Sequence, residues 1–341
     1  MRRHDFRSDT VTLPTPAMMA AIARAPLGDA ARGDDPTVNE LERLAAEITG
    51  KEEALFLPSG AMANLAALIA HDCRGGEVIV EEAAHIYGSE GGGLSVVAGA
   101  IARPIRGERG ILAPSVIATA IRGSADLALA PTRLICLENT HNASGGRVMP
   151  LEVMAEIHAV ARAAGISVHF DGARLFNAAA YLGAPIAALC QYADSVWFAL
   201  CKGLGGPIGA ILAGDAAFMR KARRAAKMLG GGMRQAGLIA APAIVALQDP
   251  YDGHRRDHEL ARRLARGLAA LRPGLLDAPE VQTNIVNCFI DDAAAVTRRL
   301  GERGVLAIGR GRKIRFVTHR QVDDVSVDAA IAAFADILEG P

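Results

Sequence analysis

The sequence has no excess of charge of either sign, because 37 Lys and Arg residues balance 37 Asp and Glu residues. This balance argues against nucleic acid or an anionic membrane surface as the main partner. No CxxC pair occurs among the five cysteines. The cysteines therefore predict neither a disulfide framework nor a metal site, and they fit a reducing compartment.

Long hydrophobic runs are also missing. The longest apolar stretches, such as Gly237–Leu247, are far shorter than the ~20 residues that a membrane span needs. The first ten residues, MRRHDFRSDT, are polar and lack the apolar core of a signal peptide. We therefore expect a soluble, cytoplasmic protein with no membrane partner.

The 341 residues are 51% hydrophobic, which is enough to bury a sizeable core and excludes a disordered chain. Several short apolar runs are continuous rather than alternating, as in strands that are buried on both faces of a parallel sheet. Helical stretches lie between these runs, so the pattern predicts an α/β fold with a mostly parallel sheet sandwiched by helices. The expected strands are residues 54–57, 77–81, 133–139, 166–172, 194–200 and 208–214.

The first clear helix follows the sequence GDDP. Asp35 is expected to cap it, Pro36 suits its first position, and Gly50 is expected to end it.

A polar stretch, Gln248–His258, is the best candidate for a domain boundary. Beyond it the sequence predicts a small α+β domain with helices at 255–271, 293–303 and from about 325, and strands around 285–290 and 314–318. The expected division is a large domain over residues 1–250, with an N-terminal arm, and a small domain over residues 251–341.

Polar residues that follow the expected strands are the candidates for chemistry, because parallel sheets bind ligands beyond the carboxyl ends of their strands. Ser59, Gly60 and Ala61 open a helix after one strand, as either an ordinary capped turn or an anion site. Asp171 and Arg174 follow another strand. They form either a helix cap with its own salt bridge or a site whose carboxylate holds a proton on a heteroaromatic nitrogen.

Lys202 comes directly after a third apolar strand, where a charged amine is costly unless it is used. Burial lowers the pKa of a lysine, as an imine-forming amine requires, whereas the alternative is a lysine that reaches the surface. Lys202, Asp171 and the helix start at Ser59 together form a set of residues that fits pyridoxal 5′-phosphate. The ring of this cofactor acts as an electron sink. His85 could then stack on that ring, although alone it is better explained as a helix-start histidine.

Four segments form a specific set: RSDTVT (7–12), GDDPTVN (33–39), LENTHN (137–142) and GGGMRQ (230–235). Together they resemble the low-specificity L-threonine aldolases, which have the aspartate-aminotransferase fold of pyridoxal-phosphate enzymes. The resemblance runs from Phe6 to His319, nearly the whole chain. It implies that Lys202 forms the Schiff base, that Asp171 pairs with the ring nitrogen, and that His85 stacks on the ring near the substrate hydroxyl.

The resemblance also implies binding roles for further residues and an oligomer. The family is usually a homotetramer built from dimers that share active sites, and Arg234 would reach the cofactor or phosphate of a neighbouring subunit. The substrate carboxylate would be held by Ser8, Arg174 and Arg315, and the phosphate by Ser59, Gly60 and Ala61.

The implied activity is retro-aldol cleavage of L-threonine, L-allo-threonine and related β-hydroxy-α-amino acids to glycine and an aldehyde, with His85, directly or through a water, as the base. β-Elimination and transamination use the same cofactor and remain alternatives, because only the orientation of the Cα substituents decides between them. A non-catalytic binding module is an alternative of another class, against which the retained Lys202 and Arg315 argue.

Three departures from the family pattern stand out. Cys201 takes the place of the usual serine before the lysine, and a thiol is a poor donor to phosphate, so we expect lower cofactor affinity. Arg32 stands where the family often has a tyrosine, and residues 125–132 contain no histidine where many members have a second active-site histidine.

Overall fold

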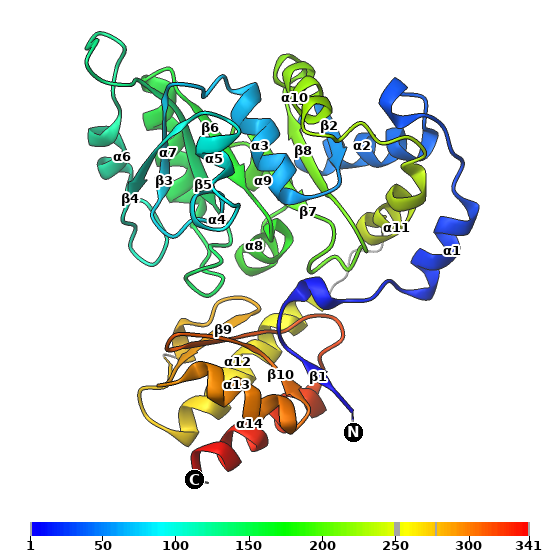
Figure 1. Cartoon of the computed structure of the whole chain (residues 1–341), viewed down its shortest axis with the longest axis vertical. Coiled ribbons are helices and arrows are strands. Elements are labelled where there is room, and N and C mark those ends of the chain that lie inside the picture. The colour runs from blue at the N-terminus through cyan, green and yellow to red at the C-terminus, as the bar shows by residue number, and fades with distance from the viewer. Residues whose placement is uncertain (1, 249–252, 277, 340–341) are drawn as a thin grey trace.

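The computed structural model describes residues 2–248, 253–276 and 278–339, which form a large part and a smaller part (Figure 1). The large part surrounds a seven-stranded sheet in which β8 (Ala210–Gly214) runs antiparallel to both neighbours and all other pairings are parallel. The prediction of an α/β fold with a mostly parallel sheet is confirmed. From one edge of the sheet to the other, the strands are β2 (Glu53–Leu57), β8, β7 (Ser195–Ala199), β6 (Ser167–Asp171), β5 (Thr132–Glu138), β3 (Glu77–Glu81) and β4 (Ile101–Ile105).

The edge strand β4 is the one strand of this sheet that the sequence does not predict. Its five residues are exposed or only partly buried and include Pro104, which cannot donate to a sheet ladder. An edge strand has a neighbour on one side only, so it needs no continuous apolar run. The pattern that reveals the buried strands is therefore absent here.

Helices cover both faces of the sheet. One face carries α3 (Gly60–Ala70), α5 (Gly93–Val96) and α10 (Ala216–Met228). The other face carries α2 (Pro36–Thr49), α6 (Pro114–Ala120), α7 (Leu151–Ala163), α8 (Leu175–Leu182), α9 (Ile186–Cys190) and α11 (Gly237–Gln248), with α1 (Pro16–Arg24) packed along α11.

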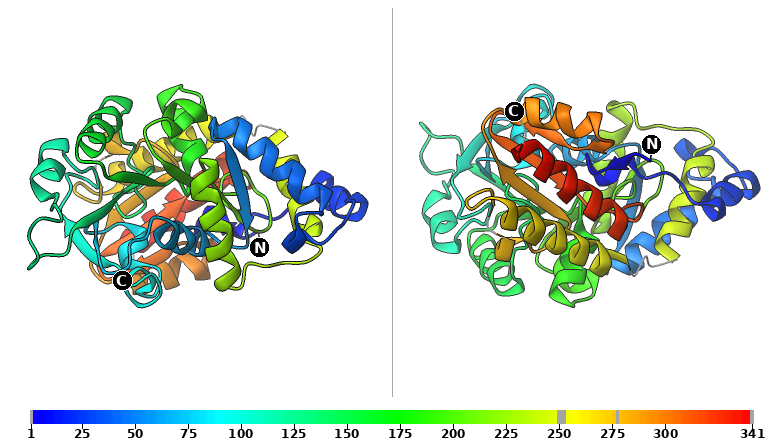
Figure 2. Two further views of the ribbon diagram at one scale, coloured as in Figure 1. Left: turned by 90° about the horizontal axis from the view of Figure 1, so that it is seen from above. Right: turned by 90° about the horizontal axis from the view of Figure 1, so that it is seen from below.

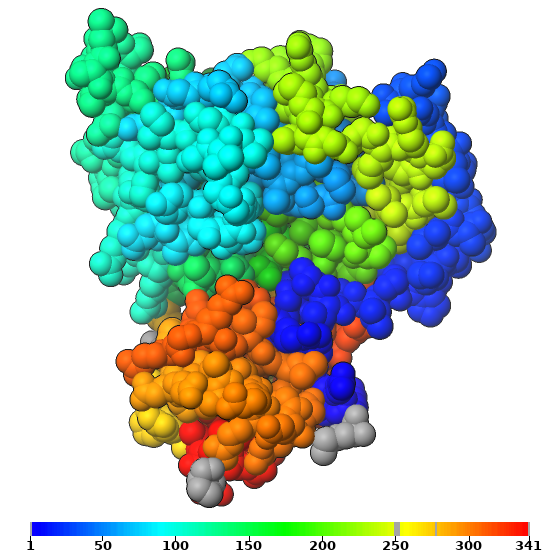
Figure 3. Space-filling view, in the orientation of Figure 1, coloured from blue at the N-terminus to red at the C-terminus, as the bar shows by residue number. Residues whose placement is uncertain are grey.

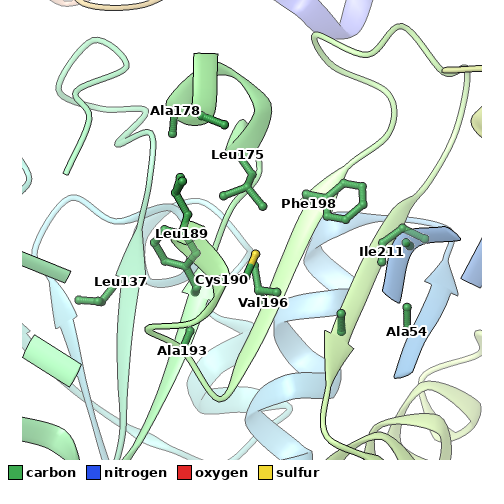
Figure 4. Packing of buried hydrophobic residues seen from close by; sticks show 14 of the residues in the cluster. Ala54, Leu137, Leu175, Ala178, Leu189, Cys190, Ala193, Val196, Phe198 and Ile211 are labelled. Atoms are coloured by element: carbon green, nitrogen blue, oxygen red, sulfur yellow. The ribbon is translucent and has the colours of Figure 1, made fainter. Parts of the chain in front are cut away.

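Strand β7 shows how the two faces are separated. Val196 and Phe198 belong to the core under α8 and α9, where they lie near Leu175 and Leu189 (Figure 4). Because side chains alternate along a strand, Trp197 belongs instead to the core under α3. The same alternation directs Asp171, the last residue of the neighbouring strand β6, toward α3.

The helix after GDDP is α2, as predicted. Asp35 caps it, since one carboxylate oxygen accepts from the backbone N–H groups of Thr37 (3.1 Å) and Val38 (3.0 Å). Gly50 ends the helix in the left-handed conformation with φ of 68°.

The small part is the predicted α+β unit. A three-stranded antiparallel sheet contains β11 (Ile308–Arg310), β12 (Lys313–Val317) and β9 (Ile285–Phe289). The helices of the small part are α12 (Gly253–Leu271), α13 (Ala293–Glu302) and α14 (Asp324–Glu339). Seen from below, α12 and α14 lie side by side against this sheet (Figure 2).

The N-terminal segment packs with the small part. Strand β1 (His4–Asp5) pairs in parallel with β10 (Val305–Leu306), and Phe6 is buried in the core of the small part. Figure 3 shows this blue segment at the junction of the two parts. The expected boundary between residues 250 and 251 lies outside the described residues, so the division into domains stays a proposal.

Among the described residues, no helix is both long enough and apolar enough to cross a bilayer. The apolar stretch Gly237–Leu247 forms most of α11 instead.

Candidate active site

The predicted site residues meet at the carboxyl ends of neighbouring strands. His85 follows β3, Asp171 ends β6, Arg174 lies three residues later, and Lys202 follows β7. The imidazole of His85 and the carboxylates of Glu90 and Asp171 present atoms that all lie within 4.8 Å of one another. The strand order therefore brings together residues that are far apart in the chain.

Asp171 is a buried carboxylate held by two donors. The backbone N–H of Ala173 donates to one oxygen at 3.1 Å, and the amide of Asn64 donates to the other at 3.1 Å. Burial, followed by the nearby carboxylates of Glu138 and Glu90, raises the pKa of Asp171 to about 7. A cationic partner placed here would favour the ionised form.

Lys202 begins the glycine-rich turn between β7 and β8, and its side chain is partly buried. Its amine lies 5.7 Å from the centroid of the Trp197 ring, and in the described part of the chain it has no hydrogen-bond acceptor. Burial, followed by the charge of Arg174, lowers the pKa of Lys202. A Cβ at Gly203 would lie 2.7 Å from the ring of His254, so the turn requires a glycine beside the lysine.

His85 is the first residue of α4 (His85–Gly88), and Glu90 orients it. The Nδ1 atom lies 2.9 Å from Oε1 of Glu90, whose side chain is only 3% exposed. The hydrogen bond to Glu90 raises the pKa of His85, although burial opposes it. With Nδ1–H donated to this carboxylate, the lone pair of Nε2 is free to accept a proton.

Glu138 supports the same region from the end of β5. Its two carboxylate oxygens accept from the backbone N–H groups of His85 and Asn142, both at 2.7 Å. Sequence reasoning missed Glu138, Glu90 and Asn64, because none of them stands beside a recognised site residue. The only available signal was that Glu138 and Asn142 lie in the LENTHN segment.

Arg174 and Arg315 converge on one oxygen. An Nη1 atom of each guanidinium donates to Oδ1 of Asn142, at 3.1 Å from Arg174 and 3.2 Å from Arg315. The Nε atom of Arg315 is buried and has no partner in the described residues. Two guanidinium groups that share one neutral acceptor can hold a carboxylate there.

Arg174 is anchored from the N-terminal segment by Asp9. Its Nε and Nη2 atoms donate to the two oxygens of Asp9 at 2.7 and 2.8 Å, and both side chains are buried. Burial raises the pKa of Asp9, but the charge and hydrogen bonds of Arg174 outweigh it, so the pKa lies below its ordinary value. Sequence reasoning missed Asp9, which is a neighbour of the predicted Ser8 in RSDTVT.

Ser8 is partly buried and caps the short helix η1 (Asp9–Val11), where its Oγ accepts from the N–H of Thr10 at 3.2 Å. It is thus carried to the site by the same segment as Asp9.

The predicted phosphate residues open α3. Ser59 caps the helix, with its Oγ accepting from the N–H of Met62 at 3.3 Å. The first N–H groups of a helix, here those of Gly60 and Ala61, have no partner inside it and suit an anion. A Cβ at Gly60 would lie 2.3 Å from the Trp197 ring, so only glycine allows α3 to begin this close to β7.

Arg234 does not join the other predicted site residues. Its side chain is 58% exposed, and its guanidinium pairs with Asp29 at 2.9 Å. Cys201, beside the lysine, is a free and partly buried thiol, and burial raises its pKa.

A cavity of about 460 Å³ opens beside this cluster. Residues of the large part, His85 and Asn142 among them, form one wall, and Arg310, Lys313 and Arg315 of the small part form the other. The cavity therefore lies between the two parts, next to the point where the two arginines converge.

The chain matches the family model of the beta-eliminating lyases over residues 5–291. It is 41% identical to low-specificity L-threonine aldolase 1 of Arabidopsis thaliana, over 99% of this chain and 97% of that relative. It is 42% identical to the low specificity L-threonine aldolase of Escherichia coli K12, over 93% of this chain and 94% of that relative. The solved threonine aldolase of Leishmania major has the same fold, with a TM-score of 0.82 at 20% identity over 98% of this chain and 99% of that one.

Proposed function

The chain belongs to the beta-eliminating lyase family, and we propose that it cleaves L-threonine, L-allo-threonine and related β-hydroxy-α-amino acids to glycine and an aldehyde, using pyridoxal 5′-phosphate. One observation of the site carries this proposal. The carboxylate of Asp171 and the amine of Lys202 follow adjacent strands, and within the described residues neither forms an ion pair. A buried acid and amine without ionic partners fit a ligand that supplies both a basic ring nitrogen and an aldehyde.

The residues present fit this cofactor. When bound, pyridoxal phosphate supplies a conjugated ring that accepts the electron pair of the bond broken at Cα. Lys202 would hold the aldehyde carbon through Nζ, and Asp171 would keep the ring nitrogen protonated. Ser59, Gly60 and Ala61 would hold the phosphate at the start of α3.

The arginines would select which bond breaks. Arg174 and Arg315 would bind the substrate carboxylate where they now share Oδ1 of Asn142. A carboxylate held at two points fixes the rotation about the Cα–N bond. The two arginines would thereby favour cleavage of the Cα–Cβ bond over the other bonds at Cα.

His85 would move the proton. Its Nε2 atom is free because Nδ1 is engaged by Glu90. In this role His85, directly or through a water, accepts the proton of the β-hydroxyl as the aldehyde leaves. Glu90 stabilises the protonated imidazole that results.

The direct test is an assay of the purified protein with L-threonine and pyridoxal phosphate. Aldol cleavage gives equal amounts of glycine and acetaldehyde. The matched family model is named for β-elimination, which would give 2-oxobutanoate and ammonia instead and is the second candidate function. Products without glycine would contradict the proposed aldolase, and no product with any amino acid would favour a binding module.

The proposal includes a cytoplasmic homotetramer built from dimers. All five cysteines are free, as in a reducing compartment. The exposed Arg234 would reach the cofactor of a neighbouring subunit. Light scattering on the purified protein tests the tetramer.

Replacing Arg315 with alanine should raise KM for L-threonine about 10- to 100-fold, because a charged hydrogen-bond partner of the carboxylate is lost. The product ratio should also shift away from glycine, since the Cα–N rotation is less constrained. Steady-state kinetics with product analysis check both effects. Arg312→Ala, at an exposed position of the same hairpin, is the matched control. An unchanged KM and product ratio would place the carboxylate elsewhere.

Replacing Arg174 with alanine should weaken substrate binding and destabilise the protein together. The variant leaves the buried Asp9 carboxylate without its ion partner, at a cost of about 3–5 kcal/mol. Thermal unfolding should show this loss. The double variant Asp9→Asn with Arg174→Ala should recover part of the stability but not the substrate affinity. Wild-type stability of Arg174→Ala would contradict the buried pair.

The pH dependence of kcat/KM should report the protonation of the His85 imidazole. The imidazole must be neutral to act as a base, so activity rises as pH passes its pKa, which lies above the ordinary 6.5. Glu90→Gln removes the charge that favours imidazolium, so the midpoint should fall by about 1 in pH. Glu82→Gln, at an exposed site nearby, should leave it unchanged. An unmoved midpoint in Glu90→Gln would show that another group titrates.

Both L-threonine and L-allo-threonine should be cleaved, with allo-threonine the better substrate and a ratio of kcat/KM within about a hundredfold, or ~2.7 kcal/mol. Residues 125–132 provide no second histidine, and Leu127 in this loop is 97% exposed. The β-hydroxyl therefore has one fixed partner, His85. Assays of both epimers decide the point, and a preference of several thousandfold would reveal a further discriminating group.

A further inference from the structure

A chain of hydrogen-bonded side chains leads from Asp171 to the residue that follows α3. The amide of Asn64 joins Asp171 to Nε2 of His169 at 3.1 Å. Nδ1 of His169 lies 2.8 Å from the hydroxyl of Ser195, which lies 2.7 Å from Nε2 of His71. Asn64, His169 and Ser195 are fully buried.

The fold places these residues in register. His169 stands two positions before Asp171 on β6, so both side chains point to the same face. Ser195 is the cross-strand neighbour of His169 on β7. Asn64 and His71 are seven residues apart on and directly after α3, which packs on that face. Two strands and one helix therefore hold these hydrogen-bonded side chains in place.

The carboxylates determine how the Asn64 amide is turned. Its Nδ2 atom lies 2.7 Å from Oε1 of Glu90 and 3.1 Å from Oδ2 of Asp171. When both carboxylates are ionised they only accept hydrogen bonds, so the NH₂ group faces them and Oδ1 faces His169. The Nε2 atom of His169 must then carry the proton and donate it to Oδ1.

The proton on Nε2 of His169 determines the direction of the remaining hydrogen bonds. Burial, followed by the charge of His71, lowers the pKa of His169 to about 3, so its ring is neutral and Nδ1 is an acceptor. Ser195 then donates its hydroxyl proton to Nδ1. The oxygen of Ser195 in turn accepts from Nε2–H of His71. The donor and the acceptor of each hydrogen bond in the series are therefore assigned.

We propose that His169, backed by Ser195, is a positioning residue that locks the Asn64 amide with its NH₂ group toward Asp171, and so keeps that carboxylate ionised for the ring nitrogen of the cofactor. The inference rests on the proposed function, since it assigns a purpose to Asp171. Without the donor at Nε2, nothing holds Oδ1 on the side of His169, and the amide can turn that oxygen toward the protonated form of Asp171, whose pKa lies at about 7. That arrangement disfavours the ionised acid and weakens its hold on a protonated ring.

The first experiment uses the cofactor-free wild-type protein. Solid-state NMR with ¹⁵N-labelled histidine, at pH 8, distinguishes protonated from unprotonated ring nitrogens, and comparison with His169→Gln identifies the signals of His169 among those of nine histidines. The expected result is protonated Nε2 and unprotonated Nδ1. Protonated Nδ1, or a doubly protonated ring, would overturn the proposal. This result does not depend on enzymatic activity.

The second experiment titrates variants with pyridoxal phosphate and follows the visible absorbance. His169→Leu removes the donor and should weaken cofactor affinity about 10- to 100-fold. His169→Gln places an amide N–H near the Nε2 position and should stay within about threefold of wild type. A simple packing role predicts the opposite order, because leucine keeps the buried site apolar and glutamine does not.

A double-mutant cycle shows whether His169 acts through Asn64. In an Asn64→Ala background, His169→Leu should cause no further loss of cofactor affinity. If the losses of cofactor affinity from Asn64→Ala and His169→Leu multiply in the double variant, the proposal is overturned. Equal affinities of the His169→Leu and His169→Gln variants would also overturn it. If the leucine variant does not fold, the NMR result and the glutamine titration decide. A wild type that binds no cofactor would instead refute the proposed function, whereas the protonation state of His169 would still be read from the NMR spectra.

Discussion

Replacing Lys202 with alanine should remove the visible absorbance of the cofactor-loaded protein and lower kcat for L-threonine cleavage on the order of 10⁴-fold, about 5 kcal/mol. The amine of Lys202 is the one that the fold places beside Asp171, Arg174 and Asp9. Its burial and the absence of an acceptor in the described residues leave it free to react with an aldehyde. Alanine removes the amine that would form the covalent link to the cofactor.

Absorption spectra and single-turnover assays measure the two effects. Lys221→Ala and Lys227→Ala, both at exposed positions, are matched controls and should behave as wild type. Reduction of the wild-type protein with borohydride, followed by peptide mapping, should place the cofactor on Lys202. A label on Lys221 or Lys227 would defeat the assignment.

Asp171→Asn should still bind the cofactor but lose activity by about 10²- to 10³-fold, or roughly 3–4 kcal/mol. An amide cannot stabilise a protonated ring nitrogen, so the ring accepts electrons poorly. The variant also places an amide against the NH₂ group of Asn64, which now donates to the carboxylate. Equilibrium titration with the cofactor and kcat for threonine cleavage separate binding from chemistry.

Asp194→Asn is the matched control for this variant. Asp194 precedes β7 at the opposite end of the strand, where its carboxylate accepts from the N–H of Val168 at 2.7 Å. Activity of Asp171→Asn within about threefold of wild type, a change of under ~1 kcal/mol, would remove Asp171 from this role.

The buried strands of the large part could be predicted from sequence because continuous apolar runs are a local property. β3 (Glu77–Glu81) has the expected bounds, and β5 to β8 differ from the expected ranges by no more than two residues at either end. The edge strand β4 and the short strands β1, β10 and β11 lack this pattern. Exposure and short length remove the hydrophobic signal on which such a prediction depends.

The residues with a chemical signal of their own were also visible in the sequence. An acid, an arginine and a lysine directly after apolar strands indicate a site, whatever the order of those strands. Their supporting partners carry no such signal. Asp9 meets Arg174 across 165 positions, and Asn64 meets Asp171 across 107.

The sequence by itself therefore determined the buried strands, the two ends of α2 and the candidate residues at the strand ends, because each depends on neighbours within a few positions. Only the tertiary structure decided that Asp9 engages Arg174 and that Asn64 faces Asp171. These contacts follow from the strand order β2-β8-β7-β6-β5-β3-β4 and from the pairing of the N-terminal segment with the small part. Such long-range packing is set by burial of the whole core, so no local pattern reveals it.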